Sequence, residues 1–237
     1  SWLGGSLLAA SVPVASGRLV WSATQDVPES LPLRVPRFVA DATLGRTFDW
    51  LPGDGDASHP LARYGQELDV SVVVRSSVSK GDTVTRLARI LIQSTRESDS
   101  GTVEVSGVGV LRHALTDLLT SPIQPTGTLA SEARRLVPAG MGVSIDPLLT
   151  DRACPQSMVW SSNRLDALQE IADAWPALLR CDEWGQVRFK APLDAIPDPV
   201  VTLRDGEGGT VAGAPRSDSR DAAFNRVIAR SSASGVE

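Results

Sequence analysis

The chain is poor in the residues that most often carry catalysis, metal binding or covalent cross-links. Its 237 residues include two cysteines and two histidines. Cys154 and Cys181 form no CxxC pair, and a disulfide-stapled secreted domain would use more cysteines, so we expect two thiols outside any bridge or metal site. His59 and His113 are too few for many zinc sites and catalytic triads, and they lack the HExxH spacing. We therefore expect no catalytic, cofactor-binding or metal-binding residue.

The distribution of charge argues against binding to a nucleic-acid backbone, and the hydropathy argues against a membrane-spanning segment. The chain has 23 basic and 28 acidic residues, a formal net charge of −5, and no local concentration of basic residues that would hold a phosphate backbone. No apolar run reaches the length needed to cross a bilayer. With 42% hydrophobic residues, the chain reads as globular and long enough for one large or two modest domains. We expect Ser1 to lie inside a longer protein.

Alternating hydrophobic residues predict a strand-rich first half. In the run 67–74 one face collects Leu68, Val70, Val72 and Val74, the pattern of a half-buried strand. Further strands are expected at 83–97, at 101–110 and as two short strands within 18–37. Prolines in the second short strand remove ladder donors and predict an edge strand or an unpaired extended segment. Residues 41–60 are expected to form a polar loop.

The hydrophobic period then changes to that of helices. Helices are expected at 109–120 and at 129–137, the second with Thr128 as its N-cap. The stretch WSSNRLDALQEIADAWPALLRCDEWGQVRFK (160–190) predicts an amphipathic helix capped by Ser162 or Asn163, followed by a hairpin at 177–181 and 186–190. Gly185 is expected to supply a positive φ in the turn. Helix and hairpin can bury each other as a small α+β domain.

These patterns predict an α+β fold with three parts, 1–122, 123–215 and 216–237. The first part is expected to be rich in strands, and the second to contain the helix–hairpin domain. Within the last part of the chain we expect a strand at 200–204, a glycine-rich turn at 206–209 and a strand at 224–232.

Short motifs that look chemical are better explained as turns. Asp54, Asp56 and Ser58 alternate like the start of a calcium loop, but the glycine and the bidentate acid that such a loop needs are missing. Ser77 and Lys80 match S-x-x-K in a turn between strands, and a cell-wall hydrolase using this pair is an alternative hypothesis.

Two further short motifs are also better explained as turns than as catalytic or binding sites. Asp182 and Glu183 are paired acids at a hairpin tip, where nothing removes water to raise a carboxyl pKa for general-acid work. The run GEGGT (206–210) lacks the GK[ST] of a phosphate loop. A third hypothesis is a carbohydrate-binding β module that uses Trp21, Trp50 or Trp184, although packing is the commoner use of tryptophan.

The order of segments resembles the tail hub proteins (minor tail or baseplate hub proteins) of long-tailed phages, especially those that infect actinobacteria. The resemblance rests on these stretches, in order: WLGGSLLAASVPVASGRLVWSATQDVPESLPLRVP (2–36), HPLARYGQELDVSVVV (59–74), GTVEVSGVGVLRHALTD (101–117), SPIQPTGT (121–128), the 160–190 stretch and SRDAAFNRVIARSS (219–232). It spans nearly the whole chain.

The resemblance implies a structural virion protein rather than an enzyme. It implies that 1–122 is an N-terminal segment with a first β-barrel-like domain, that 123–215 is an inserted α+β domain, and that 216–237 is the first strand of a second β-barrel domain. It implies a homotrimeric ring at the distal tail tip that joins the six-fold tail tube to a three-fold spike or fibre and lines the channel through which DNA leaves. The implied partners are a distal tail protein, the tape measure protein and a central spike, tail fibre or receptor-binding protein. Assembly would take place in the cytoplasm of the bacterial host.

Overall fold

The computed structural model describes residues 1–41, 46–75 and 81–192, together with Arg204. Apart from Arg204, these residues lie in one compact unit, Ser1–Ala195. The expected glycine-rich turn at 206–209, the strand at 224–232, the proposed domain 216–237 and the pair Ser77 and Lys80 lie outside the described residues, as does all but Arg204 of the expected strand at 200–204. Within the described part, no helix is long and apolar enough to cross a membrane.

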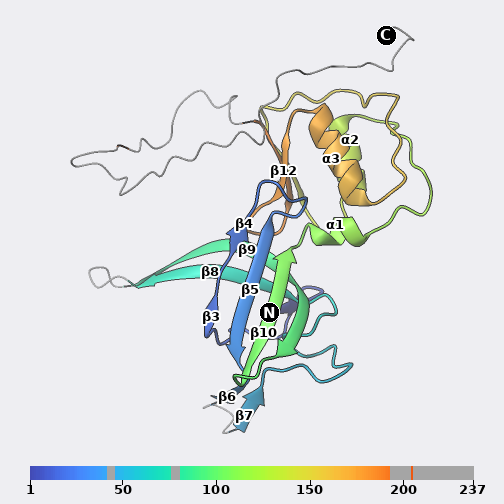
Figure 1. The fold of residues 1–237 in the computed structure, drawn as a ribbon. Coiled ribbons are helices and arrows are strands. Elements are labelled where there is room, and N and C mark those ends of the chain that lie inside the picture. Colours follow the sequence, from blue (N-terminus) through green and yellow to red (C-terminus); the bar gives the residue numbers. More distant parts are fainter. Residues whose placement is uncertain (42–45, 76–80, 193–203, 205–237) are drawn as a thin grey trace, which may run out of the picture. The chain divides into compact units, whose positions relative to one another are not determined.

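An eight-stranded antiparallel sheet forms the first half of the chain (Figure 1). Its strands are β1 (Trp2–Leu3), β2 (Ser6–Leu7), β3 (Ser16–Gly17), β4 (Val20–Trp21), β5 (Glu29–Pro36), β8 (Glu67–Arg75), β9 (Asp82–Glu97) and β10 (Thr102–Gly109). They run in the order β2-β1-β8-β9-β10-β5-β3, and β4 also pairs with β5. This path is open among the described residues, so the β-barrel that the resemblance implies is not confirmed.

Strand β5 is an interior strand, so the expectation of an edge strand was wrong. It pairs with β10 from Ser30 to Pro36 and with β3 and β4 on its other side. The carbonyls of Pro32 and Arg34 accept hydrogen bonds from the β3–β4 side, from Arg18 N and Ala15 N. Because alternate residues of a strand face the same neighbour, both prolines (Pro32 and Pro36) direct their missing N–H away from β10. They therefore cost the main ladder no hydrogen bond.

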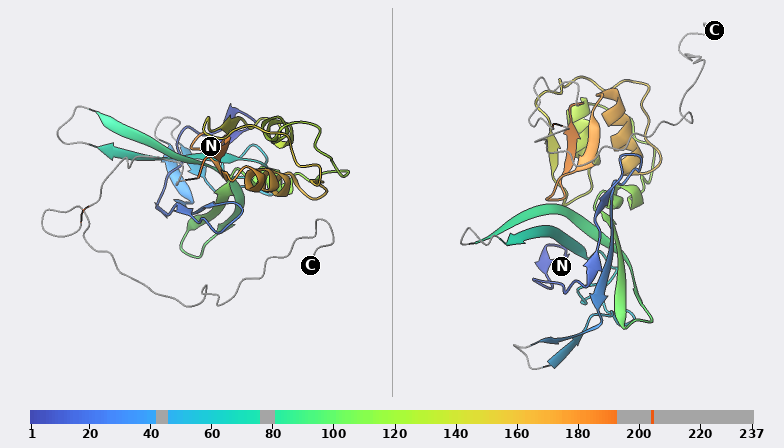
Figure 2. Two further views of the ribbon diagram at one scale, coloured as in Figure 1. Left: turned by 90° about the horizontal axis from the view of Figure 1, so that it is seen from above. Right: turned by 60° about the vertical axis from the view of Figure 1, so that its left-hand side comes forward.

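Strand β9 is long because it pairs with two different strands, one after the other along its length. Its first half pairs with β8 and its second half with β10, and the register shifts once in each half. Leu87 has no opposite residue on β8, and Gln93 has none on β10. Extra residues of this kind are β-bulges, which bend a strand and increase its twist. Figure 2 shows β9 curving from the β8 hairpin into the β5–β10 sheet.

The inward residues of β5, β8, β9 and β10 form one hydrophobic core. Its fully buried members are Val35, Leu61, Ile90, Ile92, Val103 and Val105, each at most 2% exposed. Gly107 lies where β10 approaches β9 closely: a Cβ on it would come within 2.4 Å of the Ile90 side chain. The glycine is therefore required by packing rather than by backbone conformation.

A hairpin was missed in the region assigned to a polar loop. β6 (Phe38–Asp41) pairs with β7 (Arg46–Asp49) as a separate two-stranded sheet. Arg37 holds its base, because the guanidinium donates to Asp49 (Nε to Oδ1, 3.1 Å) and also pairs with Glu97 of β9. The hydrogen bond from Arg37 lowers the pKa of the Asp49 carboxyl from its usual value. Residues 50–60 are turn and loop, as expected.

The second half of the described chain is a small α+β body. Its elements are α1 (Arg112–Thr116), α2 (Leu129–Leu136), β11 (Val143–Ile145), α3 (Arg164–Ala174), β12 (Leu178–Cys181) and β13 (Val187–Lys190). β13 lies between a parallel neighbour, β11, and an antiparallel one, β12. Helices α2 and α3 and this sheet share a core that includes Leu168, Ile171, Val187 and Phe189, all fully buried. Among the described residues, strands therefore hold more of the chain than the three helices do.

Local capping explains where two of the helices begin. Asn163 accepts a hydrogen bond from Asp166 N at 2.9 Å, and Thr128 accepts one from Ser131 N at 3.3 Å, so both expected N-caps are confirmed. Gly185 has φ +80, as the turn required. The helix expected at 109–120 is shorter, because the chain after α1 leaves the helix and pairs with the segment before α3 through a Leu118–Asn163 bridge.

Candidate interaction site

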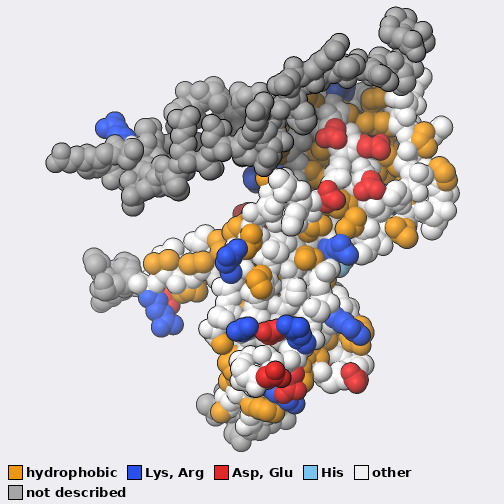
Figure 3. All heavy atoms as spheres, viewed as in Figure 1, with side chains coloured by type: hydrophobic (Ala, Val, Ile, Leu, Met, Phe, Trp, Pro, Cys, Tyr) orange, Lys and Arg blue, Asp and Glu red, His pale blue; other side chains and the backbone are white. Residues whose placement is uncertain are grey.

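The distal part of the β8–β9 hairpin is the most unusual surface of the molecule. We call residues 71–75 and 82–86 the arm. β1 pairs with β8 only at Glu67, and β10 pairs with β9 only from Ile90 onward, so among the described strands both edges of the arm are open. Figure 3 shows hydrophobic side chains along the arm. The exposed ones are Val72 (45%), Val73 (51%), Val74 (55%) and Val84 (63%).

The arm continues the hydrophobic stripe that the sequence shows on β8. Leu68 is only 5% exposed and lies in the core, and Val70 packs partly against it. Val72 and Val74 share that face but stand beyond the last core residue, because the β-sheet neighbours end before them. The four residues do share one face of β8, as expected. Only the first two of them, Leu68 and Val70, lie in or against the core.

A network of charges fixes the base of the arm. Asp69 accepts from Arg89 (Nε to Oδ1, 3.0 Å) and pairs with Arg86, and Glu67 lies 3.3 Å from His113 (Oε1 to Nε2). Arg86 also donates to the Glu183 carbonyl at 2.9 Å. The Arg86 Cζ stacks 4.3 Å from the ring centre of Trp184, a cation–π contact. These contacts join the hairpin to the β12–β13 turn of the α+β body.

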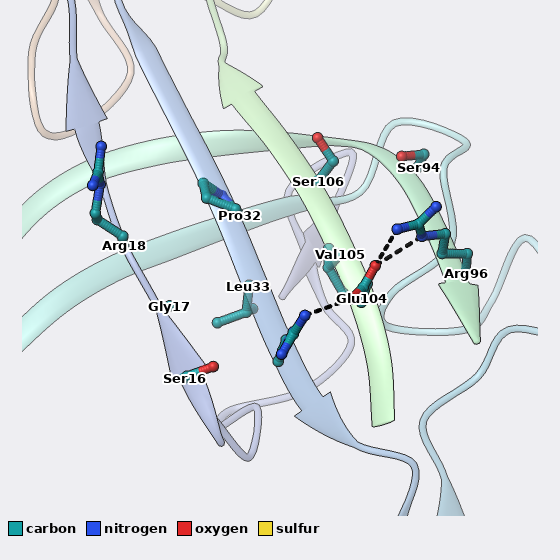
Figure 4. A pocket seen from close by; sticks show the side chains of 11 residues that line it. Ser16, Gly17, Arg18, Pro32, Leu33, Ser94, Arg96, Glu104, Val105 and Ser106 are labelled. Carbon is teal, nitrogen blue, oxygen red and sulfur yellow. Dashed lines mark hydrogen bonds and ion pairs between the residues drawn. The ribbon is translucent and has the colours of Figure 1, made fainter. Parts of the chain in front are cut away.

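A second surface lies on the outward face of β5, β10 and β9 (Figure 4). Glu104 accepts from Arg34 (Nη2 to Oε1, 2.9 Å) and from Arg96 (Nε to Oε2, 2.8 Å), which sit opposite it on the two flanking strands. The hydrogen bond from Arg96, followed by the charge of that arginine, lowers the pKa of Glu104. These residues line a groove of about 610 Å³ together with Arg18. Two arginines on one carboxylate leave this face with an excess of positive charge.

A third surface is an apolar recess, which we call the hollow. It has a volume of about 390 Å³ and is lined by the N-terminal segment, by the β6–β7 hairpin and by residues that follow this hairpin. Its lining residues are Leu8, Ala9, Ser11, Pro13, Val39, Ala40, Phe48, Trp50 and Pro60. Exposed Leu7, Val14 and Phe38 adjoin these segments in the sequence. Phe48 is itself 36% exposed, so the hollow is open to solvent.

The two histidines have structural partners. His59 is buried; its Nδ1 accepts from Leu61 N at 3.1 Å, its Nε2 donates to the Asp49 carbonyl at 3.0 Å, and its ring stacks on Phe48. His113, as described above, is paired with Glu67 at the base of the arm. His59 lies beside two other candidates, because it follows Ser58 and its backbone N donates to the Asp56 carbonyl at 3.4 Å.

The acidic candidates act as turn residues. Asp56 accepts from the N and the Oγ of Ser58, and the hydroxyl hydrogen bond is the largest cause of its lowered pKa. Asp182 accepts from Trp184 N and Gln186 N at the tip of the β12–β13 hairpin. Within the described residues there is no group of three or more side chains that could hold a metal ion.

The remaining candidate residues, two cysteines and three tryptophans, differ in how far they are buried. Cys154 and Cys181 are free and partly buried, and burial raises the pKa of both thiols. Trp50 is buried, whereas Trp21 and Trp184 are 52% and 55% exposed. Sequence reasoning missed the arm and the hollow. The run Val72-Val73-Val74 was the available signal, because valines on both faces of a strand cannot all face one core.

Comparison with known proteins gives a structural match but no sequence match. No protein-family model and no curated protein matches the chain. The solved structure of a tail protein from Neisseria meningitidis MC58 is similar with a TM-score of 0.53 at 13% identity, over 84% of this chain and 52% of that one. This likeness shows a shared fold, and the chain spans about half the length of the solved structure.

Two further solved structures are similar at lower scores. The 43 kDa tail protein of prophage MuSo2 from Shewanella oneidensis has a TM-score of 0.46 at 14% identity, over 79% of this chain and 53% of that one. Prophage tail protein gp18 from Listeria monocytogenes EGD-e has a TM-score of 0.41 at 9% identity, over 74% and 43%. Neither score is high enough to carry an argument.

Proposed function

We propose that the chain is a structural component of a phage tail. The observation that carries this proposal is the fold shared with the Neisseria tail protein over 84% of this chain. Four of the candidate residues support a structural role, because each has a partner in a turn or an ion pair or accepts within a loop: His59, His113, Asp56 and Asp182. The order of sequence segments that resembles tail hub proteins points the same way.

We further propose a position at the distal tail tip, in a ring of three copies. The open path of the large sheet supports this, because open strands of one copy can be completed by its neighbours. In that position the ring would join the six-fold tube to a three-fold spike or fibre and line the DNA exit channel. Its partners would be the distal tail protein, the tape measure protein and the spike or receptor-binding protein, with assembly in the host cytoplasm.

Mass measurement tests the ring directly. The full-length protein, purified at about 1–50 μM, is examined by light scattering coupled to size exclusion and by native mass spectrometry, alone and with its tail neighbours. The proposal expects three copies per particle. A stable monomer that never joins a ring with tail proteins contradicts it.

A second candidate function is carbohydrate binding, which the exposure of Trp21 and Trp184 favours. Arg86 already covers one face of the Trp184 ring, which leaves less of it for a sugar to stack on. Glycan binding that is lost in Trp184→Ala and in Trp21→Ala, with the fold intact by circular dichroism, would support this function.

A further inference from the structure

The arm exposes valines on both of its faces. The register places Val73 opposite Val84 on one face, between the Arg75–Asp82 pair and Arg86. On the other face Val72 lies opposite Thr85 and Val74 opposite Thr83. A partner could therefore contact valines on either side of the ribbon.

The charges of the arm are balanced within the chain. Arg75 and Asp82 pair across the ribbon near its tip (Nε to Oδ2, 3.7 Å), and Arg86 pairs with Asp69. Among the described residues, the arm therefore offers no unbalanced charge that would favour a nucleic acid or a highly charged protein. A two-stranded ribbon with open edges is also marginally stable in water unless something covers it. These features favour an apolar partner.

The hollow is an apolar recess on the same chain. Apart from Ser11 its lining side chains are hydrophobic, and they come from the N-terminal segment, from the β6–β7 hairpin and from Trp50 and Pro60 beyond it. The β6–β7 sheet has two strands only, so its edges can also pair with an added strand. Arm and hollow are thus complementary in polarity.

The register places the arm and the hollow at opposite ends of the β5–β10 ladder. β6 begins two residues after Pro36, which pairs with Thr102 at one end of that ladder. At the other end Gly109 pairs with Ile90, and the arm is the part of β9 that continues beyond Ile90. An arm that leaves one end cannot fill a hollow at the other, so the complementary hollow must belong to another copy.

We propose that the arm of one copy inserts into the hollow of a second copy, head to tail. Such a contact uses two different surfaces of each copy, so it closes only in a ring or continues as a filament. The inference rests on the proposed function only where it takes the contact to close into a ring of three copies. The contact itself needs no other tail protein.

Cysteine cross-linking between two variants tests the contact in the full chain. In a background with Cys154→Ala and Cys181→Ala, we place Val84→Cys in the arm of one variant and Ala40→Cys in the hollow of another. The variants carry tags of different mass, are mixed, and are treated with a short bismaleimide. The matched control replaces Ala40→Cys by Glu170→Cys, an exposed position on α3.

The inference expects a mixed product from Val84→Cys with Ala40→Cys and none from Val84→Cys with Glu170→Cys. A product of Val84→Cys with itself indicates arm-to-arm pairing and overturns it. Three copies by native mass without the mixed product also overturn the inference, while the proposed ring stands. If the mixed product forms but the protein is absent from purified phage tails, the inference is supported and the proposed function is overturned.

A charge in the arm provides an independent readout. Val84→Asp is expected to weaken association by more than roughly tenfold, because an unpaired carboxylate would have to leave water in the hollow. The control is Ser100→Asp in an exposed turn, which should leave association unchanged. Circular dichroism of both variants should match the parent, since Val84 is 63% exposed in one copy. Unchanged association in Val84→Asp contradicts the proposed contact.

Discussion

Replacing Glu132 tests how the α+β body is held together. Glu132 is buried on α2, and its Oε1 accepts from Thr126 N (2.9 Å) and Gly127 N (3.0 Å), while Oε2 pairs with Arg135 (Nε, 2.6 Å). The side chain thereby ties the loop before α2 to the helix. Glu132→Ala removes an ionised acceptor from two backbone donors and one guanidinium.

The expected cost follows from these contacts. Hydrogen bonds to a charged group contribute about 1.5–3 kcal/mol each, and water can reach part of the exposed loop, so we expect Glu132→Ala to lose about 2–4 kcal/mol. For a chain of this size that lowers Tm by about 4–16 °C. Glu132→Gln keeps an acceptor for the two N–H groups and loses the pair with Arg135, so it should lose about half as much. Glu170→Ala, exposed on α3, is the control.

The effect should also depend on pH. Burial alone would raise the pKa of Glu132, but the hydrogen bonds from Thr126 and Gly127 and the pairing with Arg135 outweigh it and lower the pKa below the usual 4.5. A carboxyl with a lowered folded pKa stabilises the fold above its unfolded pKa, and the stabilisation is lost as pH falls through the folded pKa. The difference between parent and Glu132→Ala should therefore shrink below about pH 4.5.

Urea unfolding followed by tryptophan fluorescence, between about pH 7 and pH 3, measures this difference. Two results would refute the reasoning. One is a Glu132→Ala cost no larger than that of Glu170→Ala. The other is a difference from the parent that stays constant across the acid range.

Two further substitutions test the junction and the sheet. Arg86→Ala removes the cation that stacks on Trp184, so it should cost about 1–3 kcal/mol and speed amide exchange in the β12–β13 turn, measured by mass spectrometry; unchanged exchange would rule out the junction. Gly107→Ala places a Cβ within 2.4 Å of the Ile90 side chain and should lose about 1–3 kcal/mol in urea unfolding. Gly53→Ala, where a Cβ meets nothing within 4 Å, should be nearly neutral, and equal losses in the two variants would contradict the close-approach argument.

Local signals in the sequence predicted local structure well. The Asn163 cap, the Thr128 cap and the positive φ of Gly185 each depend on residues within a few positions, and each is confirmed. The strands β8, β9 and β10 also follow from alternation, because each has one face on a shared core. Such patterns need no knowledge of distant neighbours.

Features decided by distant neighbours were missed. The helix expected at 109–120 ends early because pairing of Leu118 with Asn163 competes with helical periodicity. β5 became an interior strand because its prolines direct their missing N–H groups away from β10. Val72 and Val74 continue a core stripe past the point where the core ends, and alternation alone cannot show where a neighbour stops.

Reconstruction of intact phage particles by electron cryo-microscopy tests the central claim most directly. For a phage whose genome encodes this chain, the account predicts three copies at the distal end of the tail, with the open sheet of each copy beside its neighbours. Particles whose tail tip contains no density for this fold, or in which the chain is absent by mass spectrometry, would contradict the account.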